Sequence, residues 1–141
     1  MVEELTKYRS FNFERIVSYN TRTPRTGEIH GIHNFFVSEE EFHTLRKGGK
    51  LLEHVKTGTS WKGTPKEPFF QALKGSGNYL WRIDPYRSAQ LQKFYKKKFG
   101  DINGELLYKK TVVYYLAVNS IETLKKRWML REENKNWEDK D

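Results

Sequence analysis

Short apolar segments typical of β-strands alternate along this chain with amphipathic segments typical of α-helices, and this alternation constrains the fold most. The strand-like segments are residues 13–19, 34–37, 51–55, 79–84 and 111–118. The helix-like segments are residues 38–47, 66–74, 88–99 and 120–131. Such alternation predicts an α/β fold with a partly parallel sheet.

Local signals mark where several of these elements begin and end. Ser38 and Glu41 have the spacing of a capping box, which predicts a helix start at this point. Glycines predict the helix ends, and Ser120 is a suitable cap for the last helix. We expect a basic loop over residues 21–28, a turn over 57–64, a polar loop over 101–110 and a frayed tail over 132–141.

Composition narrows the class of protein. The 141 residues fit a single domain, and the net charge of +8 favours anionic partners without choosing among them. Cysteine is absent, which excludes disulfides, thiolate nucleophiles and Cys-ligated metal sites. The sequence shows neither an apolar run long enough to cross a membrane nor a signal-peptide pattern, so we expect a cytoplasmic protein.

The segment from Ser18 to Gly31, SYNTRTPRTGEIHG, is the most informative part of the sequence. It places Arg22 and Arg25 three residues apart, directly after a predicted strand, with Pro24 stiffening the chain between them. Guanidinium groups held in this way suit bidentate hydrogen bonding to phosphate oxygens. For the two arginines alone, a solvated basic loop is the more common explanation.

This segment, followed by FFVSEEEF, resembles the GMP-binding segment of guanylate kinases. The resemblance continues through Leu51-Leu52-Glu53, Gly63-Thr64-Pro65 and Ile83-Asp84, and covers residues 13–87 in the family's order and spacing. It implies a P-loop nucleoside monophosphate kinase-like fold for a single domain over residues 1–141. Residues 13–87 would hold the GMP-binding part with adjoining core, and residues 111–131 a core strand and the start of a lid helix.

The resemblance also implies roles for individual residues. The GMP phosphate would be bound by Arg22, Arg25, Asn34 and Lys62, and the guanine by Ser18, Glu53, Thr64 and Asp84. The chemistry agrees, because a carboxylate can accept from both N1–H and the exocyclic amine of guanine, whereas adenine has an acceptor at N1. A wrong base then leaves buried polar groups unpaired.

Several positions depart from the family pattern. Asn34 and Lys62 stand where the family usually has phosphate-binding tyrosines. The usual Ile-Asp-x-Gln-Gly reads Ile83-Asp84-Pro85-Tyr86-Arg87 here, and Arg82 stands where an acid is common. These changes bear on phosphate geometry and on ligand identity.

The family's machinery for the phosphate donor has no counterpart in this sequence. The family uses ATP with magnesium, but the chain contains no G-x-x-x-x-G-K-[ST] motif and no evident site for either. Arg131 falls where a lid arginine would sit, without the usual flanking glycines. We therefore expect a guanylate-kinase-like domain truncated at both ends, with no assigned catalytic residue and with little kinase activity by itself.

Three explanations fit this sequence. The chain is a fragment of a true guanylate kinase, which we favour, or a non-catalytic module that binds a phosphopeptide or nucleotide, or a nucleic-acid binder, which ranks last. The basic cluster at Lys93 and residues 96–98 is more often a solvated helix face. The histidines lack metal-site spacing, so no metal site is expected. An oligomer or a partner chain stays open, because an incomplete sheet would leave unpaired edges.

Overall fold

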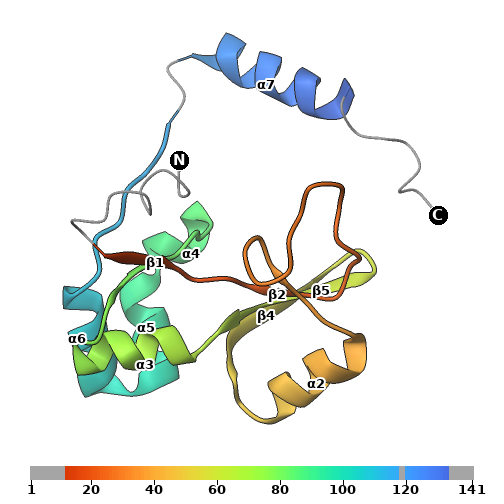
Figure 1. Cartoon of the computed structure of the whole chain (residues 1–141). Coiled ribbons are helices and arrows are strands. Elements are labelled where there is room, and N and C mark those ends of the chain that lie inside the picture. Colours follow the sequence, from red (N-terminus) through yellow and green to blue (C-terminus); the bar gives the residue numbers. More distant parts are fainter. Residues whose placement is uncertain (1–11, 118–119, 134–141) are drawn as a thin grey trace.

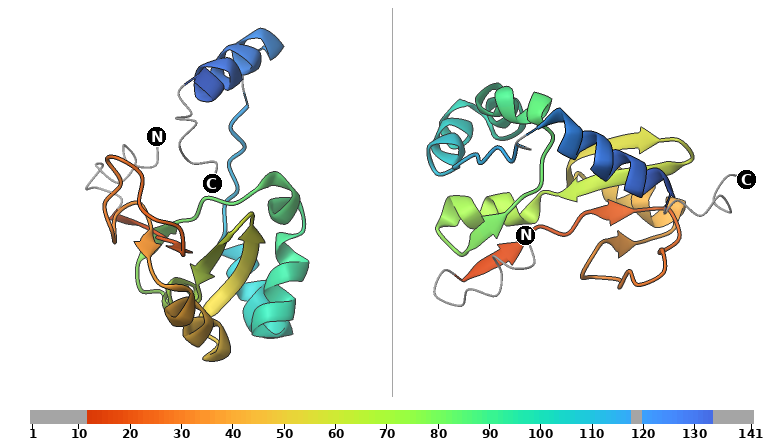
Figure 2. Two further views of the ribbon diagram at one scale, coloured as in Figure 1. Left: turned by 90° about the vertical axis from the view of Figure 1, so that its right-hand side faces the viewer. Right: turned by 90° about the horizontal axis from the view of Figure 1, so that it is seen from above.

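The computed structural model describes residues 12–117 and 120–133. It consists of two small sheets and six helices over these residues, which Figures 1 and 2 show from three sides. None of the described helices is both long and apolar enough to span a membrane. The mixture of helices with partly parallel sheets confirms the predicted α/β class.

The first predicted strand is divided between the two sheets. β1 (Phe13–Arg15) pairs in parallel with β6 (Asn78–Leu80), and the chain then crosses to β2 (Tyr19–Asn20) in the second sheet. The second sheet has the order β3-β2-β5-β4, with β3 (Phe35–Phe36), β4 (Leu51–Thr57) and β5 (Ser60–Pro65). The strand expected over residues 79–84 corresponds to β6, which is only three residues long.

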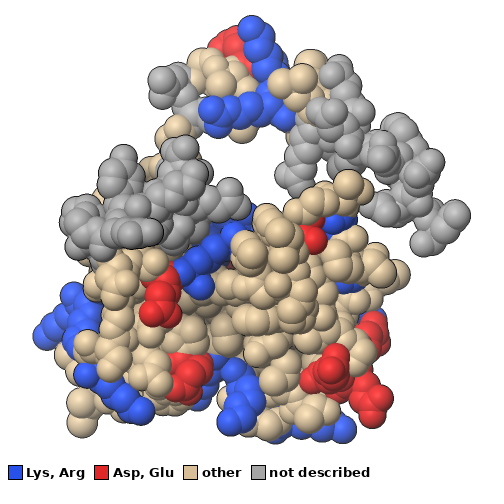
Figure 3. Space-filling view, viewed as in Figure 1, with Lys and Arg blue, Asp and Glu red and all other residues tan. Residues whose placement is uncertain are grey.

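Helix α2 (Glu39–Lys47) packs beneath the four-stranded sheet, as Figure 1 shows. Its predicted capping box is present, because the Ser38 hydroxyl accepts from Glu41 N at 3.1 Å and the Glu41 carboxylate accepts from Ser38 N at 2.8 Å. One group of the acidic side chains visible in Figure 3, at the lower right, lies over this helix. The capping signal therefore predicted this helix start correctly.

The prediction of a turn over residues 57–64 is wrong for most of this segment. Only Gly58, whose φ is +59°, and Thr59 turn the chain between β4 and β5. Gly63 lies inside β5, where an added Cβ would come within 2.9 Å of Leu51 Cδ1 and 3.0 Å of the Phe42 ring. This glycine therefore serves close packing of α2 on the sheet, not a turn.

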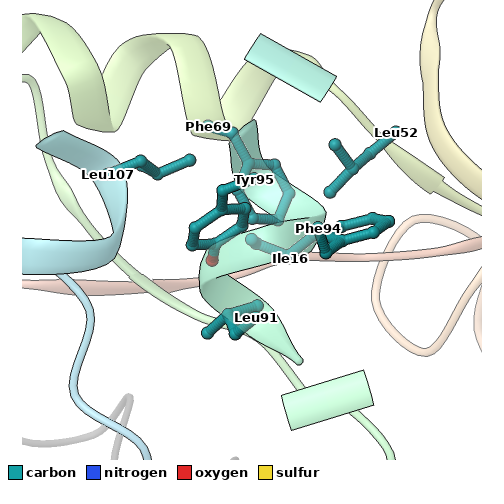
Figure 4. Close-up of a cluster of buried hydrophobic side chains, with 7 residues drawn as sticks. All are labelled: Ile16, Leu52, Phe69, Leu91, Phe94, Tyr95 and Leu107. Carbon is teal, nitrogen blue, oxygen red and sulfur yellow. The ribbon is translucent and has the colours of Figure 1, made fainter. Parts of the chain in front are cut away.

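The helices on the other side of the molecule form the main hydrophobic core. They are α3 (Glu67–Lys74), α4 (Pro85–Ala89), α5 (Leu91–Phe99) and α6 (Asp101–Lys109). The buried core residues lie around the Tyr95 ring, as Figure 4 shows. Besides Tyr95 they are Ile16, Leu52, Phe69, Leu91, Phe94 and Leu107. Leu52 and Ile16 thus tie both sheets to this helical layer.

Two expectations about this layer need correction. The helix expected over residues 88–99 is two helices, because Asp84 caps α4 and Gln90 separates it from α5. The polar loop expected over residues 101–110 is helix α6. Gly104 lies in this helix against the α5 backbone, where a Cβ would come within 2.5 Å of Lys96 N. Glycine permits this close crossing, which offsets its poor helix propensity.

The strand expected over residues 111–118 does not form within residues 111–117, and residue 118 lies outside the described residues. Val112 and Leu116 are each 72% exposed there. Ser120 caps α7 (Ile121–Glu133) as predicted, since its hydroxyl accepts from Thr123 N at 3.1 Å. Helix α7 stands away from the rest of the chain in Figure 1. The frayed tail expected over 132–141 lies mostly outside the described residues.

Candidate nucleotide-binding site

Several of the residues predicted to contact a nucleotide lie on the face of the second sheet that points away from α2. Gly63 and Trp61 of β5 point toward α2, because Gly63 abuts Phe42 and the Trp61 ring stacks on Phe42 with ring centroids 6.0 Å apart. Side chains alternate along a strand, so Lys62 and Thr64 point to the opposite face. The site is built on this face.

Strand register adds Glu53 to the same face. Glu53 pairs with Thr64 across the β4–β5 ladder, and Val55 pairs with Lys62 two residues along. On the other side of β5, Asn20 pairs with Lys62 and Tyr19 with Gly63, and Ser18 directly precedes β2. Glu53 and Thr64, two of the predicted guanine-binding residues, are therefore cross-strand neighbours, and Ser18 lies at the start of the strand beside β5.

Glu53 is a half-buried carboxylate with several charged neighbours. Burial raises its pKa above the ordinary value, and the nearby Arg87 opposes this effect most strongly. Asp84 raises the pKa further by repulsion, while Lys98 and a hydrogen bond from Thr64 lower it. The net effect is a raised pKa, so burial outweighs the ion pair. Asp84 thus belongs to the surroundings of Glu53.

The Asp84 side chain also has a structural role. One of its oxygens accepts from Arg87 N at 2.8 Å and caps α4.

Thr64 is 6% exposed, and the Glu53 side chain keeps 26% of its surface exposed. The carboxylate therefore remains reachable from solvent while its hydroxyl neighbour is held inside.

The arginine loop follows β2 at the far end of the same sheet. Arg22 forms a bidentate ion pair with Glu28, with N–O distances of 2.6 and 2.7 Å. This pair lowers the pKa of Glu28 to about 2. Arg22 N also donates to the buried Asn20 side chain at 3.2 Å, which ties the loop to β2. The same guanidinium also donates to Thr23 O at 2.8 Å, so it joins several parts of the loop.

The other predicted phosphate-binding residues lie in this loop or near it. Arg25 is exposed, and its backbone N donates to Glu28 at 2.8 Å. Asn34 is half-buried and accepts from Gly31 N through its backbone oxygen at 2.9 Å. Lys62 is exposed and pairs with Asn20. Arg131 lies in α7, where its predicted lid role stays a prediction.

Strand geometry gives the scale of the site. Glu53 and Asn20 lie two strands apart across the sheet, at about 4.8 Å per strand. Along the strands they are offset by two residues, at about 3.3 Å per residue. The carboxylate and the arginine loop are therefore separated by roughly 12 Å of sheet. None of the eight predicted residues lines the large cavity of about 810 Å³, which lies between β1, β6, α3 and the 111–116 segment.

Sequence reasoning missed three residues of this site. Asn20 and Glu28 lie inside the SYNTRTPRTGEIHG motif and had no role assigned, although a carboxylate six residues after Arg22 was visible as its ion-pair partner. Arg87 was noticed only as a departure from a glycine. Its contact with Glu53 joins α4 to β4, and no spacing in the sequence reveals it.

Comparison with known proteins decides the family. The family model "Guanylate kinase" matches residues 1–98, well over half of the chain. The chain belongs to the guanylate kinase family. This guanylate kinase-family chain is 41% identical to the guanylate kinase of Wolbachia pipientis wMel over 90 residues, which cover 64% of this chain and 45% of that protein. It is 32% identical to the guanylate kinase of Agrobacterium fabrum over 137 residues, 92% of this chain and 61% of that protein.

The fold agrees with this assignment. The crystal structure of guanylate kinase from Anaplasma phagocytophilum matches with a TM-score of 0.51 and 20% identity, over 96% of this chain and 83% of that one. The fold is thus of the P-loop nucleoside monophosphate kinase type. The chain spans about half the length of the curated relatives it matches.

The residues present do not fit a site for ATP and magnesium. No G-x-x-x-x-G-K-[ST] motif occurs in the sequence. Over residues 12–117 and 120–133, no three His, Asp or Glu side chains gather in a way that could hold a metal ion. The described residues therefore include neither a P-loop cradle for donor phosphates nor a carboxylate cluster for a metal ion.

Proposed function

We propose that this chain binds GMP, with Glu53 reading the guanine base and the arginine loop receiving the phosphate. The observation that carries the proposal is the cross-strand pair of Glu53 and Thr64 on the same sheet face as Lys62. An acceptor carboxylate beside a buried hydroxyl suits the donor edge and carbonyl of guanine. Cationic side chains at the other end of this face suit a phosphate.

Discrimination against adenine follows from the same pair. A carboxylate can accept two parallel hydrogen bonds from guanine, but it meets an acceptor at N1 of adenine. Glu53 lies half-buried, so an unfavourable contact there is poorly compensated by water. Binding should therefore favour GMP over AMP by about 100-fold or more.

Calorimetric titration with GMP, AMP and a phosphoserine peptide tests the proposal. We expect GMP to bind well above the other two, and Glu53→Gln to weaken GMP binding by roughly 10- to 100-fold. Glu40→Gln is the control, because Glu40 is exposed on α2 and should leave affinity unchanged. Equal affinity for all three ligands, or tightest binding of the peptide, would contradict guanine recognition.

We further propose that these 141 residues do not transfer phosphate efficiently by themselves. Phosphoryl transfer depends on positioning the donor and stabilising its charge, and the chain lacks the motif that does so. A coupled ADP-release assay with ATP, magnesium and GMP should show no turnover above the protein-free blank. Robust GMP-dependent turnover by the purified chain would defeat this part.

A further inference from the structure

Arg87 is held in place by the start of α4. Asp84 caps this helix by accepting from Arg87 N at 2.8 Å, and Pro85 occupies its first turn. The adjacent Ser88 is buried, and its hydroxyl donates to Pro85 O at 2.8 Å. The backbone that carries Arg87 is therefore fixed at the edge of the predicted guanine site.

The Arg87 side chain lies between a carboxylate and an aromatic ring. Its Nε is 3.2 Å from Glu53 Oε2, and its guanidinium carbon is 4.5 Å from the centroid of the Phe94 ring. Phe94 is a core residue, 6% exposed, so the ring is a rigid support. Arg87 Nε is itself buried and has no hydrogen-bond partner of good angle, so its contact with Glu53 is an ion pair.

Resting on the proposed function, we propose that Arg87 is a positioning residue for guanine recognition, which holds the Glu53 carboxylate charged and aimed at the base. In the protein, Arg87 and Thr64 lie beside this carboxylate, with Arg87 Nε 3.2 Å from Glu53 Oε2. A carboxylate has about four lone-pair sites on its two oxygens, so it can also accept from the N1–H and amine donors of guanine.

The surroundings explain why Arg87 is needed for this. Arg87 and Asp84 face Glu53 from α4 and its cap, Lys98 from α5 and Thr64 from β5. Burial and Asp84 both raise the pKa of Glu53, and Arg87 is the largest influence in the opposite direction. Lys98 has a smaller effect on the pKa of Glu53 than Arg87 has, so it is a weaker partner for this carboxylate.

The stacking on Phe94 makes arginine a better choice than lysine. A planar guanidinium can lie on a ring and present an N–H edge to a carboxylate at the same time. An ammonium group supplies the charge but not the planar contact. Lysine at this position should therefore restore part of the effect on Glu53 and not all of it.

The direct test measures the Glu53 carboxyl titration by ¹³C NMR in the absence of ligand, with the signal assigned through Glu53→Gln. In Arg87→Met the pKa of Glu53 should rise by about one unit or more, and Arg87→Lys should recover part of the shift. Arg82→Met is the matched control, because Arg82 is exposed and its removal deletes the same charge from the neighbouring segment. An unchanged Glu53 titration in Arg87→Met would overturn the proposal.

The second measurement is guanosine and GMP affinity against pH. Wild-type binding should weaken as the pH falls through the Glu53 pKa, and in Arg87→Met this loss should begin at higher pH. For a one-unit separation the variant should bind about 3-fold more weakly midway between the two midpoints, and about 10-fold more weakly below both. Guanosine removes the titration of the phosphate from the comparison. A uniform loss at every pH, with an unchanged midpoint, would show a merely structural role and refute the proposal.

The two measurements separate this inference from the proposed function. If wild-type protein binds neither guanosine nor GMP, the proposed function fails and guanine recognition by Arg87 fails with it. The NMR titration still decides whether Arg87 keeps Glu53 charged. Thermal unfolding of each variant verifies that the fold is retained.

Discussion

Arg22 shows how one side chain can organise a loop. Its guanidinium meets both Glu28 oxygens, and Glu28 also accepts from Arg25 N. The carboxylate thus joins the Arg22 side chain to the backbone of Arg25. The family resemblance assigned the two arginines to phosphate, and the structure adds the acid that orients Arg22.

Glu28→Gln should lower the free energy of unfolding by about 1 kcal/mol at pH 7, because the pair is partly exposed and screened. The folded-state pKa of about 2 lies below the ordinary 4.5, so this stabilisation is complete above pH 4.5. It is lost as the pH falls from 4.5 toward 2. Denaturant unfolding across this range should show a shallower decline for Glu28→Gln than for wild type, while Glu40→Gln should follow wild type. Parallel curves for Glu28→Gln and wild type would contradict the predicted linkage.

Lys62 and Lys56 offer a matched test of which sheet face binds the phosphate. Lys62 lies on the Glu53 face, whereas Lys56 pairs with Trp61 and lies against its ring on the α2 face. Lys62→Met should weaken GMP binding by roughly 10-fold and leave guanosine binding unchanged, since it removes one charge-assisted contact. Lys56→Met should affect neither. Titration calorimetry measures both, and equal effects of the two variants would argue against this face.

At the scale of elements, the contact between α5 and α6 decides how the helical layer packs. Gly104 brings α6 against the backbone of Lys96, and Leu107 then enters the core beside Tyr95. Gly100, with a φ of +80°, turns the chain between the two helices. Two short helices therefore form a tight pair, because glycine stands both at the turn and at the contact.

Gly104→Ala should destabilise the protein by about 3 kcal/mol, because the new Cβ would meet backbone atoms that cannot move aside without separating the helices. Asn103→Ala is the control, since Asn103 is exposed on the same helix and alanine favours helix formation. Thermal or denaturant unfolding compares the two. A Gly104→Ala protein as stable as wild type would show that α6 does not cross α5 this closely.

The whole molecule leaves much apolar surface exposed toward its C-terminal part. The exposed residues include Val112, Tyr114, Leu116, Ile121, Leu124 and Trp128. The same segment, residues 112–116, borders the cavity of about 810 Å³ beside β1 and β6. Exposed apolar side chains in such number are uncommon on a monomeric protein and favour association or dye binding.

Tyr114→Ser combined with Leu116→Ser should lower the fluorescence of bound 1-anilinonaphthalene-8-sulfonate relative to wild type, because it removes part of this apolar surface. The control is Tyr86→Ser, since Tyr86 is 75% exposed on α4, away from the cavity lining. Fluorescence titration at equal protein concentration gives the comparison. Dye binding that drops equally in the control would place the apolar surface elsewhere.

The local sequence determined the elements whose signals act over a few residues. The Ser38–Glu41 capping box, the Gly75 end of α3 and the Ser120 cap formed as predicted, because their hydrogen bonds join neighbouring residues. The family was also visible in the motif from Ser18 to Gly31. That motif carries the two arginines together with their ordering acid.

Tertiary structure alone decided the rest. Gly63 and Gly104 look like chain breakers in the sequence. In the structure, Gly63 allows Phe42 to pack closely and Gly104 allows the backbone of Lys96 to do so. Residues 111–117 have strand propensity, but within the described residues no strand pairs with them. The contact of Arg87 with Glu53 depends on packing α4 against β4. Strand pairing, helix crossing and long-range ion pairs join distant residues, so their partners become known only once the chain has folded.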